Sequence, residues 1–85
     1  MYIIIIYDLK DNQQKVNKIC KKYLNWVQNS AFEGDITESK FKQLKKEINN
    51  NIEKNDSILI YTLKDKSNLN KEKIGNEKNV LSNFI

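Results

Sequence analysis

An acidic residue follows directly after the most apolar run of the chain, and its position suggests chemistry. Four isoleucines and a tyrosine, Ile3 to Tyr7, precede Asp8. A carboxylate at the carboxyl end of a buried strand is a common position for a ligand-binding group in open α/β sheets. The same residue type also starts loops, by hydrogen-bonding its own backbone two residues on. On the residues alone, both roles of Asp8 stay open.

The composition limits which groups could work beside this carboxylate. The 85-residue chain has no histidine, so acid–base chemistry must use carboxylates, lysine, tyrosine or a water molecule on a metal. Its only cysteine, Cys20, excludes an internal disulfide and a cysteine-rich zinc site. All 15 basic residues are lysine, which contacts phosphate as a point charge because it lacks a guanidinium fork.

Size and charge favour a small protein with an anionic partner. A chain of 85 residues makes one domain near the lower limit for an independent core, and dimerisation would relieve that limit. The net charge of +4 mildly favours nucleic acid, although surface lysines also serve solubility. The longest apolar run, residues 2–7, is too short to cross a membrane, and the N-terminus lacks signal-peptide features. A cytoplasmic protein without membrane association is the simplest interpretation.

The first half of the chain predicts a strand and a helix around Asp8. Residues 2–7 are β-branched or aromatic without alternation, which predicts a central strand covered on both faces. Asp11 is predicted to cap a helix, with Gln14 completing a capping box. That helix is expected to end near residues 23–25. Its apolar stripe consists of Val16, Ile19, Cys20, Tyr23 and Leu24.

The second half predicts a hairpin, a helix and a strand. Residues 25–36, NWVQNSAFEGDI, indicate two short strands or one bent strand, with a bend at Asn29 and Ser30. Thr37 then caps a second helix. The stripe of this helix consists of Phe41, Leu44, Ile48 and Ile52. Residues 57–63, SILIYTL, form another strand.

This order of elements predicts an α+β fold, a ferredoxin-like βαββαβ sandwich with both helices on one face of the sheet. Residues 1–64 would form this ferredoxin-like domain. Residues 65–85 would form a linker and an extra C-terminal strand. A short apolar segment such as VLSNFI must add to a sheet edge, in its own subunit or in a partner's.

Four stretches resemble a known family. They are YIIIIYDL at the start, VQNSAFEG at 27–34, DSILIYTL at 56–63 and KIG at 73–75. Together they are similar to the small ferredoxin-like CRISPR-associated protein of spacer acquisition, the subunit that works beside the CRISPR integrase. The resemblance spans essentially the whole chain. Its most specific part is the hydrophobic strand ending Tyr-Asp, with V-Q-x-S-x-F-E about twenty residues later.

The resemblance implies a homodimer and a shared metal site. The C-terminal strand of each subunit would pack on the partner's sheet, and the two copies of Asp8 would face each other across the two-fold axis. Two close carboxylates repel each other unless they are protonated or bridged by a cation. Mg²⁺ (or Mn²⁺) suits such a site, because it binds through few carboxylates and completes its shell with waters and phosphate oxygens. Asp8 is therefore the predicted metal ligand.

Ser30 and Phe32 match the family's S-x-F and join Asp8 as predicted catalytic residues. Ser30 could hydrogen-bond phosphate and Phe32 could brace the site. Alternatively, Ser30 is a bend residue and Phe32 a core aromatic. The chain departs from the family pattern at residues 24–26, Leu-Asn-Trp, where arginine is usual, and at Ala31, where a larger β-branched residue is common.

The predicted function is that of a CRISPR adaptation protein, a metal-dependent endonuclease that hydrolyses phosphodiester bonds of RNA or DNA. Its partners would be a second copy of the chain, a CRISPR integrase subunit and the nucleic acid. The alternative is a non-catalytic DNA-binding scaffold of the spacer-integration complex, and a third interpretation is an unrelated regulatory dimer. The residues predicted to follow a nucleic-acid backbone are Lys10, Lys15, Lys18 and Lys22, each of which also fits a solvated helix surface.

Overall fold

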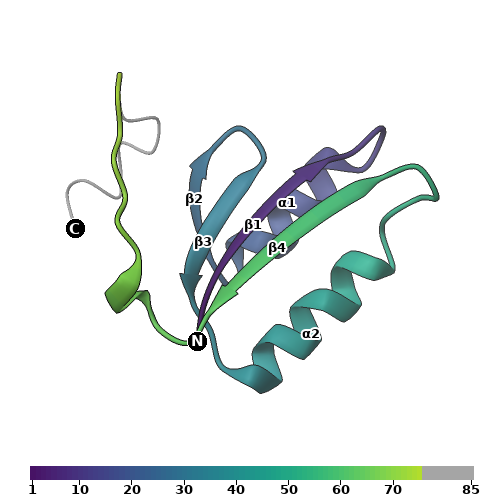
Figure 1. The fold of residues 1–85 in the computed structure, drawn as a ribbon. Helices are drawn as coiled ribbons and strands as arrows, with labels where there is room; N and C mark the ends of the chain where they lie inside the picture. Colours follow the sequence, from purple (N-terminus) through teal and green to yellow (C-terminus); the bar gives the residue numbers. More distant parts are fainter. Residues whose placement is uncertain (76–85) are drawn as a thin grey trace.

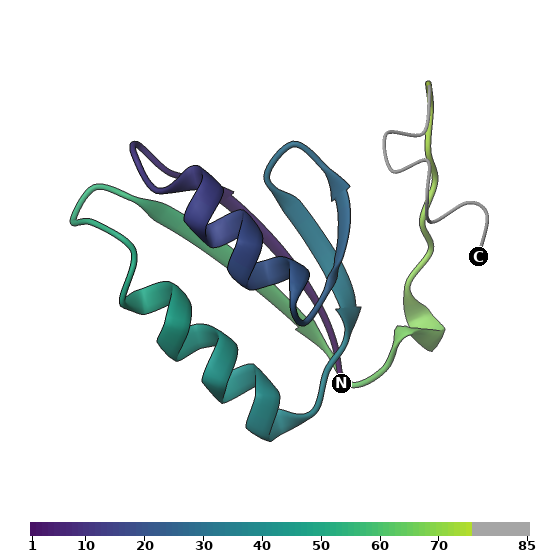
Figure 2. The same ribbon diagram turned by 180° about the vertical axis from the view of Figure 1, so that it is seen from behind.

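Two helices cover one face of a four-stranded antiparallel sheet in the computed structural model, which describes residues 1–75 (Figure 1). The strand order in the sheet is β2-β3-β1-β4. Figure 2 shows both helices lying across the same face. The elements are β1 (Tyr2–Asp8), α1 (Gln13–Lys21), β2 (Asn25–Gln28), β3 (Ala31–Asp35), α2 (Glu38–Asn49), β4 (Ser57–Leu63) and a short 3₁₀ helix, η1 (Lys66–Asn68). The predicted α+β, ferredoxin-like order is confirmed. Within residues 1–75, no helix is long and apolar enough to span a membrane.

The helices cover one face of the central strand β1, and the other face is partly exposed in this chain, so the predicted cover on both faces is confirmed for one face. Ile3, Ile5 and Tyr7 are buried beneath the helices. Side chains alternate along a strand, so Ile4 and Ile6 point to the other face, where Ile6 is 43% exposed. An unbroken run of isoleucine has no alternation that could distinguish a covered face from an open one. The second face of this sheet is called the open face below.

The helices bury the predicted stripes against the sheet. The buried residues are Val16, Ile19 and Cys20 of α1, and Phe41, Leu44 and Ile48 of α2. Thr37 caps α2 as predicted, because its Oγ1 accepts a hydrogen bond from the Lys40 backbone N–H at 3.3 Å. The predicted cap of α1 is wrong. Asn12, not Asp11, occupies the N-cap position, and its side chain makes no capping bond but donates to the Asn51 carbonyl at 2.7 Å.

Residues 25–35 form two strands rather than one bent strand. The turn between β2 and β3 contains Asn29 with a φ of 46°, a left-handed conformation that asparagine tolerates better than most residues. A register shift lies between Trp26 and Gln28, as expected for a bulge next to this turn. The hairpin therefore ends beside the carboxyl end of β1, where the Tyr7 N–H donates to the Ser30 carbonyl at 3.1 Å.

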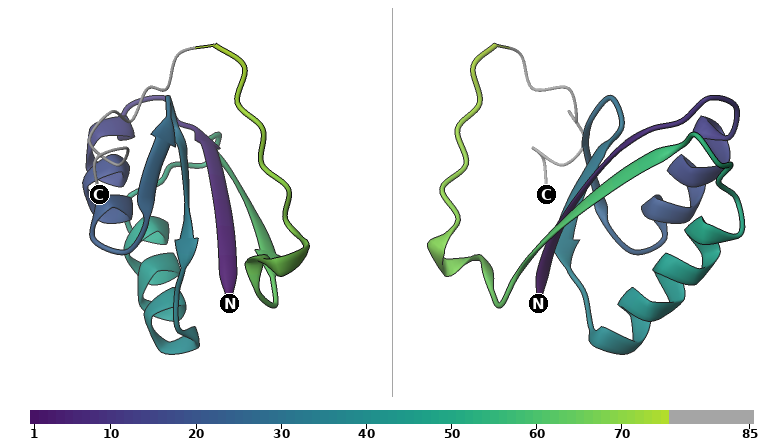
Figure 3. Two further views of the ribbon diagram at one scale, coloured as in Figure 1. Left: turned by 90° about the vertical axis from the view of Figure 1, so that its left-hand side faces the viewer. Right: turned by 45° about the vertical axis from the view of Figure 1, so that its right-hand side comes forward.

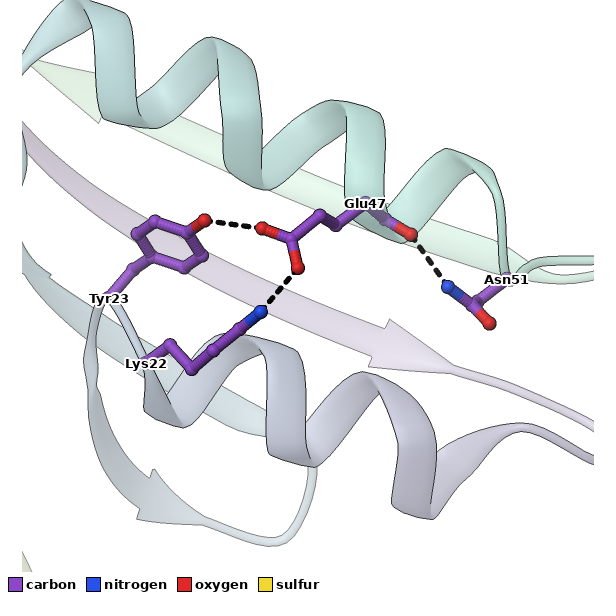
Figure 4. Close-up of polar contacts among 4 residues, drawn as sticks. All are labelled: Lys22, Tyr23, Glu47 and Asn51. Atoms are coloured by element: carbon purple, nitrogen blue, oxygen red, sulfur yellow. Dashed lines mark hydrogen bonds and ion pairs between the residues drawn. The ribbon is translucent and has the colours of Figure 1, made fainter.

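The two helices are joined by the Glu47 carboxylate of α2 (Figure 4). It accepts hydrogen bonds from the Lys22 ammonium and from the Tyr23 hydroxyl, both just after α1. The Glu47 carbonyl also accepts from the Asn51 side chain at 2.8 Å. The Lys22 and Tyr23 contacts lower the pKa of Glu47, and the Glu47 contact raises the pKa of Tyr23.

We expect Glu47→Gln to lower the melting temperature at pH 7 by a few degrees or less, because this ion pair is partly exposed to solvent. A lowered carboxyl pKa stabilises the fold above the usual glutamate pKa of about 4.3, and this contribution is lost as the pH falls through the lowered value. The difference between parent and variant should therefore close in acid. Melting curves between pH 7 and pH 3 test this, with Glu53→Gln as a control whose carboxylate makes no ion pair in residues 1–75. A difference that persists unchanged in acid would contradict the ion-pair explanation.

After β4 the chain turns through η1 and continues on the side of the sheet away from the helices (Figure 3). Two lysines attach this segment to the β2–β3 hairpin. Lys71 forms an ion pair with Glu33, and the Lys73 ammonium donates to the Gln28 side chain. Burial and the Glu33 charge raise the pKa of Tyr2, on the same face, to about 12. The predicted C-terminal strand lies outside the described residues.

Candidate metal and nucleic-acid site

Asp8 is the last residue of the interior strand β1 and is exposed to solvent. Its Cα lies opposite that of Ser57 of β4. Because Tyr7 faces the helices, the alternation of side chains directs the Asp8 carboxylate to the open face. Within residues 1–75 this carboxylate accepts no hydrogen bond and forms no ion pair. Both of its oxygens are therefore available to a ligand.

The backbone on either side of Asp8 is held firmly. Before it, the Tyr7 N–H donates to the Ser30 carbonyl at 3.1 Å. After it, the Lys10 N–H donates to one oxygen of Asp56 at 3.0 Å, and the Glu53 N–H donates to the other at 2.7 Å. The bonds from Lys10 and Glu53 lower the pKa of the Asp56 carboxyl. Asp56 thus joins the loop after β1 to the loop before β4 and remains charged at neutral pH.

The side chains of Ser30 and Phe32 lie on the helix side of the sheet. The Ser30 hydroxyl oxygen accepts a hydrogen bond from the Gln13 side chain of α1. Phe32 is fully buried, and its ring stacks on that of Tyr7 with centroids 6.2 Å apart and an interplanar angle of 12°. The structure therefore connects both residues to Asp8 through Tyr7, and it does not bring their side chains to the carboxylate.

One chain supplies few ligands for a metal. Within the described part of the chain, no group of three or more histidine, cysteine, aspartate or glutamate side chains could hold a cation. A single accessible carboxylate with two available oxygens fits the sparse protein ligand set that Mg²⁺ accepts when waters and phosphate oxygens complete its shell.

The four predicted nucleic-acid-binding lysines differ in their surroundings. Lys10 is in the loop after Asp8, and Lys15 and Lys18 are on the exposed side of α1. Their ammonium groups make no ion pair within residues 1–75. Lys22 contacts Glu47 and lies over the Tyr23 ring, 5.7 Å from its centroid. Three of the four are thus available to phosphate, whereas the fourth is occupied between the helices.

The open face carries an apolar stripe that the sequence interpretation missed. Ile6, Leu59 and Tyr61 are 43%, 53% and 54% exposed, and Ile4 lies opposite Tyr61 in the register. The alternation within residues 57–63 contained the signal. Ile58 and Ile60 pack on the core beneath the helices, so Leu59 and Tyr61 had to point away from it. The stripe runs along β1 and β4 and ends beside Asp8.

Two further contacts near Asp8 were also missed. Gln13 and Asn17 of α1 bind the Ser30 hydroxyl and the Tyr7 hydroxyl, respectively. These pairs are 17 and 10 residues apart in the sequence, so no local pattern indicates them.

Comparison with known proteins agrees with the resemblance in the sequence. The family model described as CRISPR associated protein Cas2 matches residues 1–71. A CRISPR-associated endoribonuclease Cas2 of Thermodesulfovibrio yellowstonii is 43% identical over 86 residues, which are 99% of this chain and 98% of the relative. A CRISPR-associated endoribonuclease Cas2 of Pyrococcus furiosus is 40% identical over 87 residues, covering 100% of both chains.

Solved structures agree with these matches. A crystal structure of Cas2 superposes with a TM-score of 0.84 at 33% identity, covering 92% of this chain and 90% of the other. The crystal structure of Streptococcus pyogenes Cas2 at pH 6.5 gives 0.79 at 30% identity, covering 88% of this chain and 100% of the other. The family match, the whole-chain identities and the fold lead to one conclusion: this chain belongs to the Cas2 family of CRISPR-associated proteins.

Proposed function

We propose that this chain is a CRISPR adaptation nuclease, a metal-dependent endonuclease that cleaves phosphodiester bonds of RNA or DNA. The observation that carries the proposal is the Asp8 carboxylate, which is exposed at the end of the central strand with both oxygens free of partners in residues 1–75. Relatives that match the whole chain are named CRISPR-associated endoribonucleases, which supports a nuclease rather than a scaffold alone.

The active form in this proposal is a homodimer that pairs two open faces. The stripe of Ile6, Leu59 and Tyr61 is apolar and half exposed, and its burial against a second copy would remove that surface from water. Asp8 lies on the same face, two pairs beyond Ile6 and Leu59 in the register. A two-fold axis near this end of the stripe would therefore bring the two Asp8 carboxylates into one interface.

Within that dimer the chain's residues bind and orient the substrate. The two copies of Asp8 would hold Mg²⁺ or Mn²⁺, and the bound ion would supply activation of water and stabilisation of charge on the phosphate. Lys10, Lys15 and Lys18 would attract the nucleic-acid backbone. Phe32 would act by fixing the Tyr7 ring next to Asp8. Ser30 would act by fixing the backbone of Tyr7.

The proposed cellular context follows from the family. The chain would work in the cytoplasm beside a CRISPR integrase subunit, as part of the machinery that acquires new spacers.

Removal of the metal tests the proposed reaction. We expect purified protein to cut end-labelled RNA or DNA in Mg²⁺ or Mn²⁺, to lose this activity in EDTA, and to regain it when excess Mg²⁺ is added back. Binding of the same labelled strands, measured with and without EDTA, provides the comparison. Cleavage that persists in EDTA would contradict a metal-dependent site, and binding without cleavage in every metal would favour the scaffold.

A further inference from the structure

The position of the Asp8 carboxylate depends on residues that do not touch it. Within residues 1–75 the side chain of Asp8 has no hydrogen-bond partner of its own. Its location is therefore set by the backbone at the end of β1, and Tyr7 is the last residue of this strand whose side chain is buried. Contacts that fix Tyr7 therefore also fix the backbone from which the Asp8 side chain extends.

Helix α1 contacts this strand end through two polar side chains one turn apart. Gln13 and Asn17 are four residues apart, so they lie on the same face of the helix. The side-chain oxygen Oδ1 of Asn17 accepts a hydrogen bond from the Tyr7 hydroxyl. The Gln13 amide donates to the Ser30 hydroxyl oxygen, and the Ser30 carbonyl in turn accepts from the Tyr7 N–H at 3.1 Å.

Each of these bonds restricts a different part of Tyr7. Asn17 fixes the outer end of the ring, and Ser30, held by Gln13, fixes the backbone. Phe32 supports the ring from the side by stacking. Tyr7 is 4% exposed, so its hydroxyl cannot easily exchange Asn17 for water. The ring and the backbone of Tyr7 are therefore constrained together from one helix.

We propose that Gln13 and Asn17 are positioning residues, which hold the end of β1 so that Asp8 presents its carboxylate in one place. Neither residue contacts substrate in this account. The effect on cleavage rests on the proposed function, whereas the effect on the strand end does not. Two independent measurements therefore separate the effect on the strand end from the effect on cleavage.

Amide hydrogen exchange tests the effect on the strand end. We expect Gln13→Ala and Asn17→Leu each to speed exchange of the Tyr7 amide by about tenfold or more, because the local bonds that protect it are weakened. Exchange at Ile4, in the middle of β1, should stay within about twofold of the parent. Gln14→Ala is the matched control, since Gln14 is an exposed glutamine of the same helix. Unchanged Tyr7 exchange, or an equal rise along the whole strand, would overturn the proposal.

Steady-state kinetics tests the effect on cleavage. Asn17→Leu should lower kcat about tenfold with little change in KM, because an outer-shell support is lost while the lysines are untouched. Asn17→Asp should restore kcat, since a carboxylate oxygen can still accept the Tyr7 hydroxyl bond. Full kcat in Asn17→Leu would overturn the catalytic part. If the parent itself cuts nothing in Mg²⁺, the proposed function fails, and the exchange result alone decides the role of the two side chains.

Discussion

Replacement of Asp8 by alanine is expected to lower Mg²⁺-dependent cleavage by at least about 100-fold, since loss of an outer-shell partner alone costs up to that much and a ligand should cost more. The fold should survive, because the exposed carboxylate has no partner within residues 1–75. A surface substitution of this kind changes the free energy of unfolding by about 0.5 kcal/mol or less. Cleavage of labelled RNA and DNA, measured together with melting curves, provides the test.

Asp11→Ala is the matched control for this substitution. Asp11 is an exposed aspartate three residues further along, in the loop after β1, and it neither caps α1 nor forms an ion pair in residues 1–75. We expect Asp11→Ala to retain the parent's activity. Equal cleavage by parent and Asp8→Ala, from preparations of matched purity, would contradict the assignment of Asp8 as the metal ligand.

Mixed dimers test whether both copies of Asp8 are needed. When parent and Asp8→Ala subunits are mixed equally and allowed to exchange, about one quarter of random dimers keep two carboxylates. A shared site therefore predicts about one quarter of the parent's activity. Independent sites predict about one half. The measurement requires only that subunits exchange, which mass spectrometry of a size-tagged subunit verifies.

The sequence predicts structure best where apolar residues repeat at a regular spacing or where an apolar run ends. The stripes of α1 and α2 repeat every three to four residues, which indicates one buried face of a helix. Asp8 was identified because it ends an apolar run, and the structure places it at the end of β1. These features depend only on neighbours along the chain.

The missed features depend on contacts between distant residues or on the absence of a period. The isoleucines of β1 fit either face of a strand, so the open face could not be distinguished from the covered one. Asp11 and Asn12 are both good helix caps. The structure places Asn12 at the N-cap, while its side chain bonds the Asn51 carbonyl, 39 residues away. The attachment of Ser30 to Gln13 likewise needs the tertiary fold, because the two residues are 17 positions apart in the sequence.

A charge introduced on the open face is expected to have a second large effect, on assembly of the dimer. Leu59→Lys would place an ammonium group in the centre of the apolar stripe, beside Ile6. In a dimer that pairs two open faces, each new charge would lose its water without gaining a partner, which costs several kcal/mol. The dissociation constant of the dimer should therefore rise by at least about 100-fold, equivalent to about 2.7 kcal/mol. Sedimentation at several protein concentrations measures this change.

Thr62→Lys is the matched control for assembly, because Thr62 is an exposed residue of the same strand that lies opposite Ile3 and points to the helix side. It adds the same charge to β4 without entering the stripe, so we expect it to dimerise and cut as the parent does. Leu59→Lys should lose cleavage in parallel with dimerisation, and activity should return at concentrations high enough to restore the dimer, because Asp8 itself is intact. Circular dichroism separates a folded monomer from an unfolded chain. A folded Leu59→Lys monomer that cuts at the parent's rate would show that one subunit holds the complete site. A dimer that persists in Leu59→Lys would show that the interface does not lie on the open face.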